Sequence, residues 1–185
     1  IEDLAIYRTL PNMTVMHPCD DVSAAELTRQ CLDLTGPSYM RTARNKTRVL
    51  HEDRIEEIKI GKGVVLRDGS DVCIIACGVL VAKALEAAEK LAGDGIDAGV
   101  VDMHTLKPLD GDLINRMASS TGCIVSAEDH SIIGGLGGAI AEHLSANHPV
   151  PLERVGVKDR FGESGQAEEM LDLLGLNTGD IIEAA

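Results

Sequence analysis

The sequence has very few aromatic residues and far fewer basic than acidic ones. Its 185 residues include two Tyr, one Phe and no Trp, so the core has to be built from aliphatic side chains and alanine. Lys and Arg together number 17 against 30 Asp and Glu, which gives a formal net charge of −13. Nonspecific nucleic-acid binding and binding to anionic membranes need basic patches, so we expect neither partner. No apolar run approaches the ~20 residues that a membrane span requires.

The cysteines show no pairing pattern. The five of them stand at positions 19, 31, 73, 77 and 123, and neither they nor the histidines have the spacing of a metal site. Cys73 and Cys77 fall in an apolar run, where cysteine behaves as a small hydrophobic residue. We therefore expect no bound metal and a reducing, cytoplasmic location.

A strand–helix–strand pattern runs from Asp71 to Asp110. Residues 72–77 are uninterruptedly apolar, which is typical of a strand buried on both faces of a parallel sheet. Apolar residues at helical spacing follow over residues 80–91, two glycines end the helix, and a second apolar run begins at Val100. This is a βαβ unit, which forms the nucleus of an α/β domain.

The remaining chain alternates in the same way. We expect strands at 13–16, 38–43, 64–66, 123–127 and 152–157, and helices ending at Leu10, starting at Asp20 or Asp21, and covering 109–117, 139–144, 166–174 and 178–183. The second part therefore predicts a three-layer α/β sandwich. The first part has the pattern of the closing half of an α/β domain, and such a half-sheet needs a partner to cover its open edge.

A polar, charged stretch without periodicity separates these two parts. It starts near Asn45, and two glycines end it at positions 61 and 63. We assign residues 1–48 to a partial α/β domain, 49–62 to a linker and 63–185 to the second domain. The chain begins at Ile1, directly in a helical pattern, so we expect it to be a piece of a longer polypeptide.

Two motifs offer chemistry from their residues alone. Gly134 to Gly138 follow a strand and open a helix, where backbone amides are able to hold an anion, but a tight packing turn is the favoured interpretation. Glu128-Asp129-His130-Ser131 contains an acid, a base and a nucleophile at the end of a strand. Neighbours in sequence do not face one another, so a hydrogen-bonded turn or a subunit contact is favoured over a catalytic triad. We therefore assign no catalytic residue.

Arg44 stands at the end of the strand expected at 38–43. A strand end holds a guanidinium rigidly, and a guanidinium is able to bind a phosphate through two oxygens. Residue chemistry alone favours a surface ion pair for this position.

Several segments resemble transketolases. Residues 1–12 resemble the segment that follows the Gly-Glu-Asp-Gly-Pro-Thr-His-Gln motif of that family, and Tyr39 to Arg44 resemble its strand ending in a substrate-phosphate arginine. Residues 106–110, 128–130 and 157–165 resemble motifs of its C-terminal domain. The resemblance covers essentially the whole chain in order.

The resemblance implies an enzyme that depends on thiamine diphosphate and magnesium and transfers a two-carbon ketol unit between sugar phosphates, as in the pentose phosphate pathway. Residues 1–48 would be the end of a pyrimidine-binding domain and 63–185 the transketolase C-terminal domain. Arg44 would bind the substrate phosphate, and Arg41 is expected to matter less. The cofactor- and metal-binding parts would lie on a missing N-terminal partner, so this chain alone would be inactive and hold no cofactor. A homodimer is expected.

Three alternatives stay open at this stage. Similar C-terminal domains occur in 1-deoxyxylulose-5-phosphate synthases and in the β subunits of 2-oxo-acid dehydrogenases. The chain could also serve only as a structural and dimerisation module. The segments at residues 1–5 and 41–44 favour transketolase.

Overall fold

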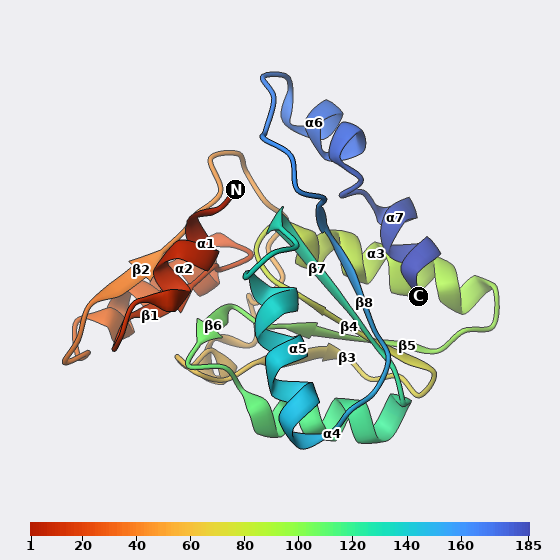
Figure 1. The fold of residues 1–185 in the computed structure, drawn as a ribbon, viewed down its shortest axis with the longest axis horizontal. Coiled ribbons are helices and arrows are strands. Elements are labelled where there is room, and N and C mark those ends of the chain that lie inside the picture. Colours follow the sequence, from red (N-terminus) through yellow and green to blue (C-terminus); the bar gives the residue numbers. More distant parts are fainter.

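A five-stranded sheet forms the centre of the molecule (Figure 1). The computed structural model describes residues 1–185. The strands lie in the order β3-β5-β4-β7-β8, and their bounds are β3 Val64–Arg67, β4 Val72–Ala76, β5 Ala98–Asp102, β7 Ile124–Ser131 and β8 Leu152–Val157. Strands β5, β4, β7 and β8 run parallel, and only the edge strand β3 is antiparallel to its neighbour. The predicted βαβ nucleus is confirmed, because β4 and β5 pair in parallel on either side of the connecting helix.

The alternation of side chains along β4 separates two hydrophobic cores. Val72, Ile74 and Ala76 face the helices α3 (Leu80–Gly93) and α7 (Thr178–Ala184). Cys73 and Ile75 face α4 (Gly111–Thr121) and α5 (Leu136–Asn147) on the opposite side. Because both faces are covered, every residue of β4 is buried, which is the physical reason for its purely apolar sequence. The predicted α/β fold with a three-layer sandwich is confirmed.

A second sheet has three short strands, in the order β2-β1-β6. The strands β1 (Thr14–Met16) and β2 (Ser38–Met40) pair in parallel, with α1 (Asp3–Thr9) and α2 (Asp21–Cys31) before and between them. Strand β6 (Thr105–Lys107) comes from far along the chain and pairs antiparallel with β1. One side of the half-sheet, that of β1, is therefore covered from within this chain, whereas β2 lies at the other edge of the sheet.

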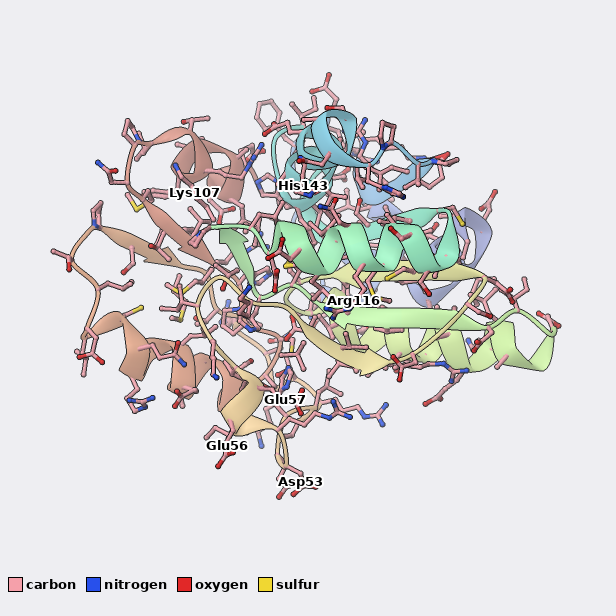
Figure 2. All side chains as sticks on the ribbon, turned by 90° about the horizontal axis from the view of Figure 1, so that it is seen from below. Asp53, Glu56, Glu57, Lys107, Arg116 and His143 are labelled. Carbon is pink, nitrogen blue, oxygen red and sulfur yellow. The ribbon has the colours of Figure 1, made fainter.

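Lys107 shows how closely the later segment contacts the first one. Its ammonium group donates to the carbonyl oxygens of Arg8 and Leu10, at 3.0 and 2.6 Å, and Figure 2 places it beside the N-terminal part of the ribbon. Leu4 and Val15 belong to the same apolar cluster as Cys73 and Ile75. The two sheets thus share a hydrophobic core.

The segment expected to be a linker is held against both sheets. It contains one short 3-10 helix, η1 (Ile55–Glu57), and Asp53 and Glu56 project outward at the edge of the molecule (Figure 2). His51 and Ile58 are buried. Ile58 packs against Met16 and Leu27 in a small cluster of its own.

Some predicted bounds were wrong. The strand expected at 38–43 ends at Met40, the helix expected at 109–117 is α4 and starts at Gly111, and the strand expected at 123–127 continues to Ser131. Asp110 explains the late start of α4, because its carboxylate caps the helix by accepting from the Leu113 amide at 3.2 Å. The C-terminal helices α6 (Ala167–Leu174) and α7 lie close to prediction. None of the helices has the length and apolarity needed to cross a membrane.

Candidate functional site

Three consecutive polar residues, Glu128, Asp129 and His130, lie near the end of strand β7 and point in two directions. In a strand, neighbouring side chains lie on opposite faces. Glu128 and His130 face the start of α5, whereas Asp129 faces β1 and the residue after β2. They are therefore neither a turn nor a triad, which corrects the turn that was favoured from the sequence.

Glu128 is the anion held by the glycine-rich segment. Its two carboxylate oxygens accept hydrogen bonds from the amides of Leu136 and Gly137, at 2.7 and 2.8 Å, in the first turn of α5. Helix N-termini favour negative charge in this position. Burial nevertheless raises the pKa of Glu128 to about 7, because the two amides compensate only part of the lost hydration.

Gly135 is required for this arrangement. A Cβ atom at this position would collide with the Glu128 carboxylate and would lie 2.6 Å from His130 Nδ1. The favoured interpretation of residues 134–138, a turn that permits close packing, therefore describes part of the structure. The alternative interpretation, an anion-binding site made by backbone amides, also describes part of it. The anion held there is the carboxylate of Glu128, which belongs to the chain itself.

Asp129 joins the two sheets through ionic contacts. Its Oδ1 lies 2.8 Å from Nε2 of His17, which follows β1, and its Oδ2 accepts from Nη2 of Arg41 at 2.7 Å. Arg41 also donates to the Asp129 carbonyl oxygen at 2.8 Å. Burial alone would raise the pKa of the Asp129 carboxyl, but His17 and Arg41 outweigh it and hold the pKa below its usual value.

Gly78 allows His17 to reach this position. It follows β4 with a φ of +58°, and a Cβ there would collide with the His17 imidazole ring. The Gly78 amide also donates to the His17 carbonyl oxygen at 3.2 Å. The end of β4 and the end of β1 are thus held in direct contact.

A cavity of about 780 Å³ lies above these contacts. His17, Arg41 and Asp129 form one wall, the start of α3 and the segment around α6 form another, and residues 42–48 form the rim. Lys83 and Glu168 in the second wall pair with each other at 3.0 Å. The rim carries Arg44, Lys46 and Arg48, and none of these three makes an ion pair in the chain.

The structure changes the local context of Arg44. Because β2 ends at Met40, the residue at the strand end is Arg41, and Arg44 lies in an exposed bend beyond it. The rigid strand-end position expected for Arg44 was therefore wrong. Arg41 is bonded to Asp129 and lies near Asp3, so it holds the wall together, whereas Arg44 has a free guanidinium at the cavity.

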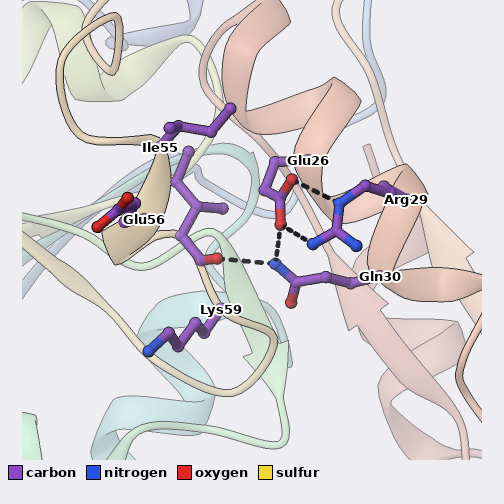
Figure 3. Close-up of a pocket in the computed structure, with 7 residues that line it drawn as sticks. Glu26, Arg29, Gln30, Ile55, Glu56 and Lys59 are labelled. Atoms are coloured by element: carbon purple, nitrogen blue, oxygen red, sulfur yellow. Dashed lines mark hydrogen bonds and ion pairs between the residues drawn. The ribbon is translucent and has the colours of Figure 1, made fainter.

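A separate hollow of about 480 Å³ lies between α2 and η1 (Figure 3). Three of its polar side chains are already paired with one another, because Glu26 binds Arg29 and Gln30, and Gln30 also donates to the Ile58 carbonyl oxygen. These contacts attach the linker to α2. We assign no ligand to this hollow.

Comparison with known proteins gives the chain its family. The family model for the transketolase C-terminal domain matches residues 61–181, and the model for the transketolase pyrimidine-binding domain matches residues 1–49. The chain belongs to the transketolase family. The resemblance inferred from the sequence motifs is confirmed.

Similar proteins include parts of enzymes and a solved structure. The 6-deoxy-6-sulfo-D-fructose transketolase subunit SqwH of Clostridium sp. (strain MSTE9) is 45% identical over 185 residues, which are 100% of this chain and 57% of that protein. One subunit of the apulose-4-phosphate transketolase of Phocaeicola vulgatus is 36% identical, over 100% of this chain and 59% of that protein. A structure described as a split gene transketolase, inactive beta4 tetramer, has a TM-score of 0.96 and 44% identity, over 100% of this chain and 60% of that one.

This chain spans little more than half the length of those relatives. Further matches are 1-deoxy-D-xylulose-5-phosphate synthases, of which the chain covers 29%. Both kinds of relative belong to a family that depends on thiamine diphosphate.

The residues of this chain do not fit the diphosphate and metal part of that cofactor. The glycine-rich helix N-terminus is occupied by Glu128. The one cluster with metal-ligand geometry contains Cys19, His51 and Asp102, whereas a magnesium ion on a diphosphate takes oxygen ligands. We therefore derive no reaction step through the cofactor from this chain.

Sequence reasoning missed His17 as part of the cavity wall and missed the cluster around Asp102. The signal for His17 was present, because it follows a predicted strand, where ligand sites in α/β sheets often lie. The residues around Asp102 come from three separate segments, so no local spacing could have indicated them.

Proposed function

We propose that this chain is one part of a thiamine diphosphate-dependent transketolase, and that it supplies the site for the anionic end of the sugar substrate. The observation that carries the proposal is the cavity rim with Arg44, Lys46 and Arg48. In a chain with a net charge of −13, three neighbouring cations without ion-pair partners form a local positive potential. An anionic substrate group supplies the missing counter-charge.

The names of two relatives support an anionic substrate. One acts on 6-deoxy-6-sulfo-D-fructose and the other on apulose 4-phosphate, so both substrates carry an acidic group at the end of a sugar. A guanidinium is able to bind a phosphate or sulfonate through two oxygens. For this chain we propose a sugar phosphate and a two-carbon ketol transfer, with Arg44 as the phosphate-binding residue.

The activity requires a second part that carries the cofactor. We propose that an N-terminal transketolase partner binds thiamine diphosphate and magnesium, and that this chain alone binds neither the cofactor nor substrate productively. Calorimetric titration of the chain alone with thiamine diphosphate and Mg²⁺ should give no saturable heat. A micromolar dissociation constant would contradict this division.

Self-association belongs to the same proposal. The similar solved structure is described as a tetramer, and this chain exposes Ile6 and Ile133 by 60% and 58%. These two residues adjoin Ala5 and Gly134, which lie so close that a Cβ at Gly134 would come within 3.0 Å of the Ala5 Cβ, so α1 and the turn before α5 present apolar side chains in one neighbourhood. We propose a homodimer in the complete enzyme. Light scattering of the chain with and without the Ile133→Glu replacement tests this, and a monomer mass before replacement would contradict it.

Replacement of Arg44 tests the site in the reconstituted enzyme. Charge-assisted hydrogen bonds contribute roughly 1.5–3 kcal/mol, which corresponds to about ten- to a hundredfold in affinity. Arg44→Ala should therefore raise KM for a ketose phosphate by about that factor and leave KM for an unphosphorylated ketose nearly unchanged. Arg116→Ala is the matched control, because Arg116 is exposed on α4 and makes no ion pair (Figure 2).

Equal losses for both kinds of sugar would mean that Arg44 is structural. If replacement of Arg44, Lys46 and Arg48 together leaves transfer unchanged, the chain serves only as a structural or dimerisation module.

The similarity to 1-deoxy-D-xylulose-5-phosphate synthases gives a second candidate function, in which the chain is part of such a synthase. Decarboxylation of pyruvate by the reconstituted enzyme, without ketol transfer, would favour that candidate or a 2-oxo-acid dehydrogenase β-type role.

A further inference from the structure

A buried cluster of polar side chains lies beside the cavity, between the two sheets. Cys19 follows β1, His51 lies in the segment after the cavity rim, and Asp102 ends β5. His51 Nε2 and Cys19 Sγ both approach the same carboxylate oxygen, Asp102 Oδ2, at 2.8 and 3.3 Å. The exposed fractions are 3% for Cys19 and 0% for His51 and Asp102. Such a set of groups is costly to bury, because each has to be removed from water.

The chain leaves part of this cluster unsatisfied. Asp102 Oδ1 and His51 Nδ1 are buried without a hydrogen-bond partner, and Nε2 of the neighbouring His104 is buried without one as well. Most buried polar atoms in folded proteins have partners. The cluster therefore contains buried nitrogen and oxygen atoms to which no other group of the protein binds.

The side chains are held in place by the surrounding structure. Asp20 Oδ2 accepts from the amides of Leu50 and His51, at 2.7 and 2.9 Å, and so fixes the backbone that carries the His51 ring. Asp20 Oδ1 in turn accepts from the Ser23 amide at 2.8 Å as the cap of α2. Asp102 is fixed by its position at the end of a central strand. A preorganised set of ligands of this kind favours metal binding.

We propose that Cys19, His51 and Asp102 form a binding site for a zinc ion. A thiolate, an imidazole and a carboxylate are the usual zinc donors, and a thiolate disfavours magnesium and calcium. One thiolate and one carboxylate neutralise the two positive charges of the ion, so the loaded cluster has no net charge. Binding releases the thiol proton of Cys19 to the solvent.

Two of the three ligand separations need only a small adjustment, and all three donor atoms lie within 4.8 Å of one another. Zinc bonds of about 2.0–2.3 Å in a tetrahedron give ligand–ligand separations of roughly 3.3–3.7 Å. The Cys19–Asp102 separation of 3.3 Å already lies at the edge of this range, and the His51–Asp102 separation of 2.8 Å has to widen by about half an ångström. The other oxygen, Asp102 Oδ1, makes no hydrogen bond that this change would have to break. Cys19 also lines the cavity, which gives a water molecule access to the fourth position.

This site would fasten the segment of residues 49–62 to the end of β5. It does not depend on the proposed transferase activity, because none of Arg44, Lys46 and Arg48 is among its ligands. Its expected effect is on stability, since a metal that binds only the folded state raises the free energy of unfolding.

Titration of the whole chain with Zn²⁺ and with Co²⁺ tests the proposal. Calorimetry should show one saturable Zn²⁺ site that excess Mg²⁺ does not displace, and Co²⁺ should give the ultraviolet thiolate charge-transfer band and visible bands of a tetrahedral site. Cys19→Ser should remove the charge-transfer band and weaken Zn²⁺ binding by at least about a hundredfold, because even residues behind the ligands cost ten- to a hundredfold.

The matched controls are Cys31→Ser and His143→Ala, which change a cysteine and a histidine outside the cluster. Both should bind Zn²⁺ as the unchanged chain does. His51→Ala and Asp102→Asn should weaken binding, and their circular dichroism spectra show whether they fold. Two results overturn the proposal: no saturable site in the unchanged chain, or the same binding after Cys19→Ser, which would place the ion on surface carboxylates.

Discussion

The two sheets of this protein differ in what holds them together. The five-stranded sheet has strands of four to eight residues and lies between two apolar clusters of 18 and 16 buried residues. The three-stranded sheet has strands of three residues, and the cluster that it forms with α2 and the linker has three buried residues. It shares part of the 16-residue cluster through Leu4 and Val15, and beyond that it depends on polar contacts such as those of Asp129 with His17 and Arg41, and on strand β6.

The groups proposed to bind substrate and metal lie mostly in the part of the chain that forms the three-stranded sheet. The cationic rim and the Cys19–His51–Asp102 cluster belong mostly to the first 51 residues, whereas the five-stranded sheet supplies the surfaces on which they rest. Function is commonly carried by segments of lower stability that a rigid scaffold positions. The comparison therefore predicts different responses to the same substitution in the two regions.

The largest contrast should come from two matched leucines. Leu80 on α3 and Leu27 on α2 are both fully buried, and Leu→Ala in a core costs roughly 2–5 kcal/mol. Leu80→Ala should lower the free energy of global unfolding near the upper end of that range, because its cluster extends across the main sheet. Leu27→Ala should mainly increase local opening of residues 14–40. Urea denaturation with hydrogen exchange separates the two effects, and equal global losses would remove the contrast.

The ionic contact between the sheets should give the next largest effect. Asp129→Asn leaves Arg41 and His17 facing a neutral amide. Breaking a fully buried pair costs roughly 3 kcal/mol or more, and because the Asp129 and Arg41 side chains are 18% and 19% exposed, the loss should not exceed about 3 kcal/mol. The loss should be seen at neutral pH and should fade in acid, where the Asp129 carboxylate becomes protonated below its usual pKa. Asp112→Asn, at an exposed position in the first turn of α4, is the control and should change stability little. A neutral result for Asp129→Asn would mean that β6 and packing alone join the sheets.

How much could be predicted from the sequence also differs between the two sheets. The main elements of the five-stranded sheet were predictable, because β4 and α3 each carry a complete apolar pattern of their own. Strand β6 was not, because three residues have no periodicity and its partner β1 is far away in sequence. The position of Arg44 relative to the strand end was also wrong, since the strand stops at Met40 once Arg41 turns toward Asp129.

A smaller effect concerns the pH dependence within the main sheet. Glu128 has a folded pKa of about 7 against an ordinary value of 4.5, so its stabilising contribution is complete below pH 4.5 and is lost as the pH rises through about 7. Between about pH 5 and about pH 8 this group should lower the free energy of unfolding by roughly 2 kcal/mol. Glu128→Gln removes the ionisation and should flatten the profile by that amount. Denaturant titrations over this range measure it, and parallel profiles would contradict the raised pKa.

The smallest effect is expected at the exposed contact of α1 with α5. Arg8 binds both oxygens of Glu142 at 3.0 and 2.7 Å, but the Glu142 side chain is 66% exposed. Such pairs contribute roughly 0.5 kcal/mol and are screened by salt. Glu142→Gln should therefore change the midpoint of unfolding only slightly, and less in high salt. A loss comparable with that of Asp129→Asn would show that α1 is held from the surface rather than from the shared core.

Native-state hydrogen exchange of the isolated chain tests the central contrast most directly. The amides of Ile74 and Ile75 in β4 should exchange only through global unfolding, because they lie between two covered faces. The amides of Met16 and Arg41, at the ends of β1 and β2, should exchange faster, through an opening that leaves the five-stranded sheet intact. Equal protection at these two sets of amides would contradict the account, because both sheets would then unfold as one unit.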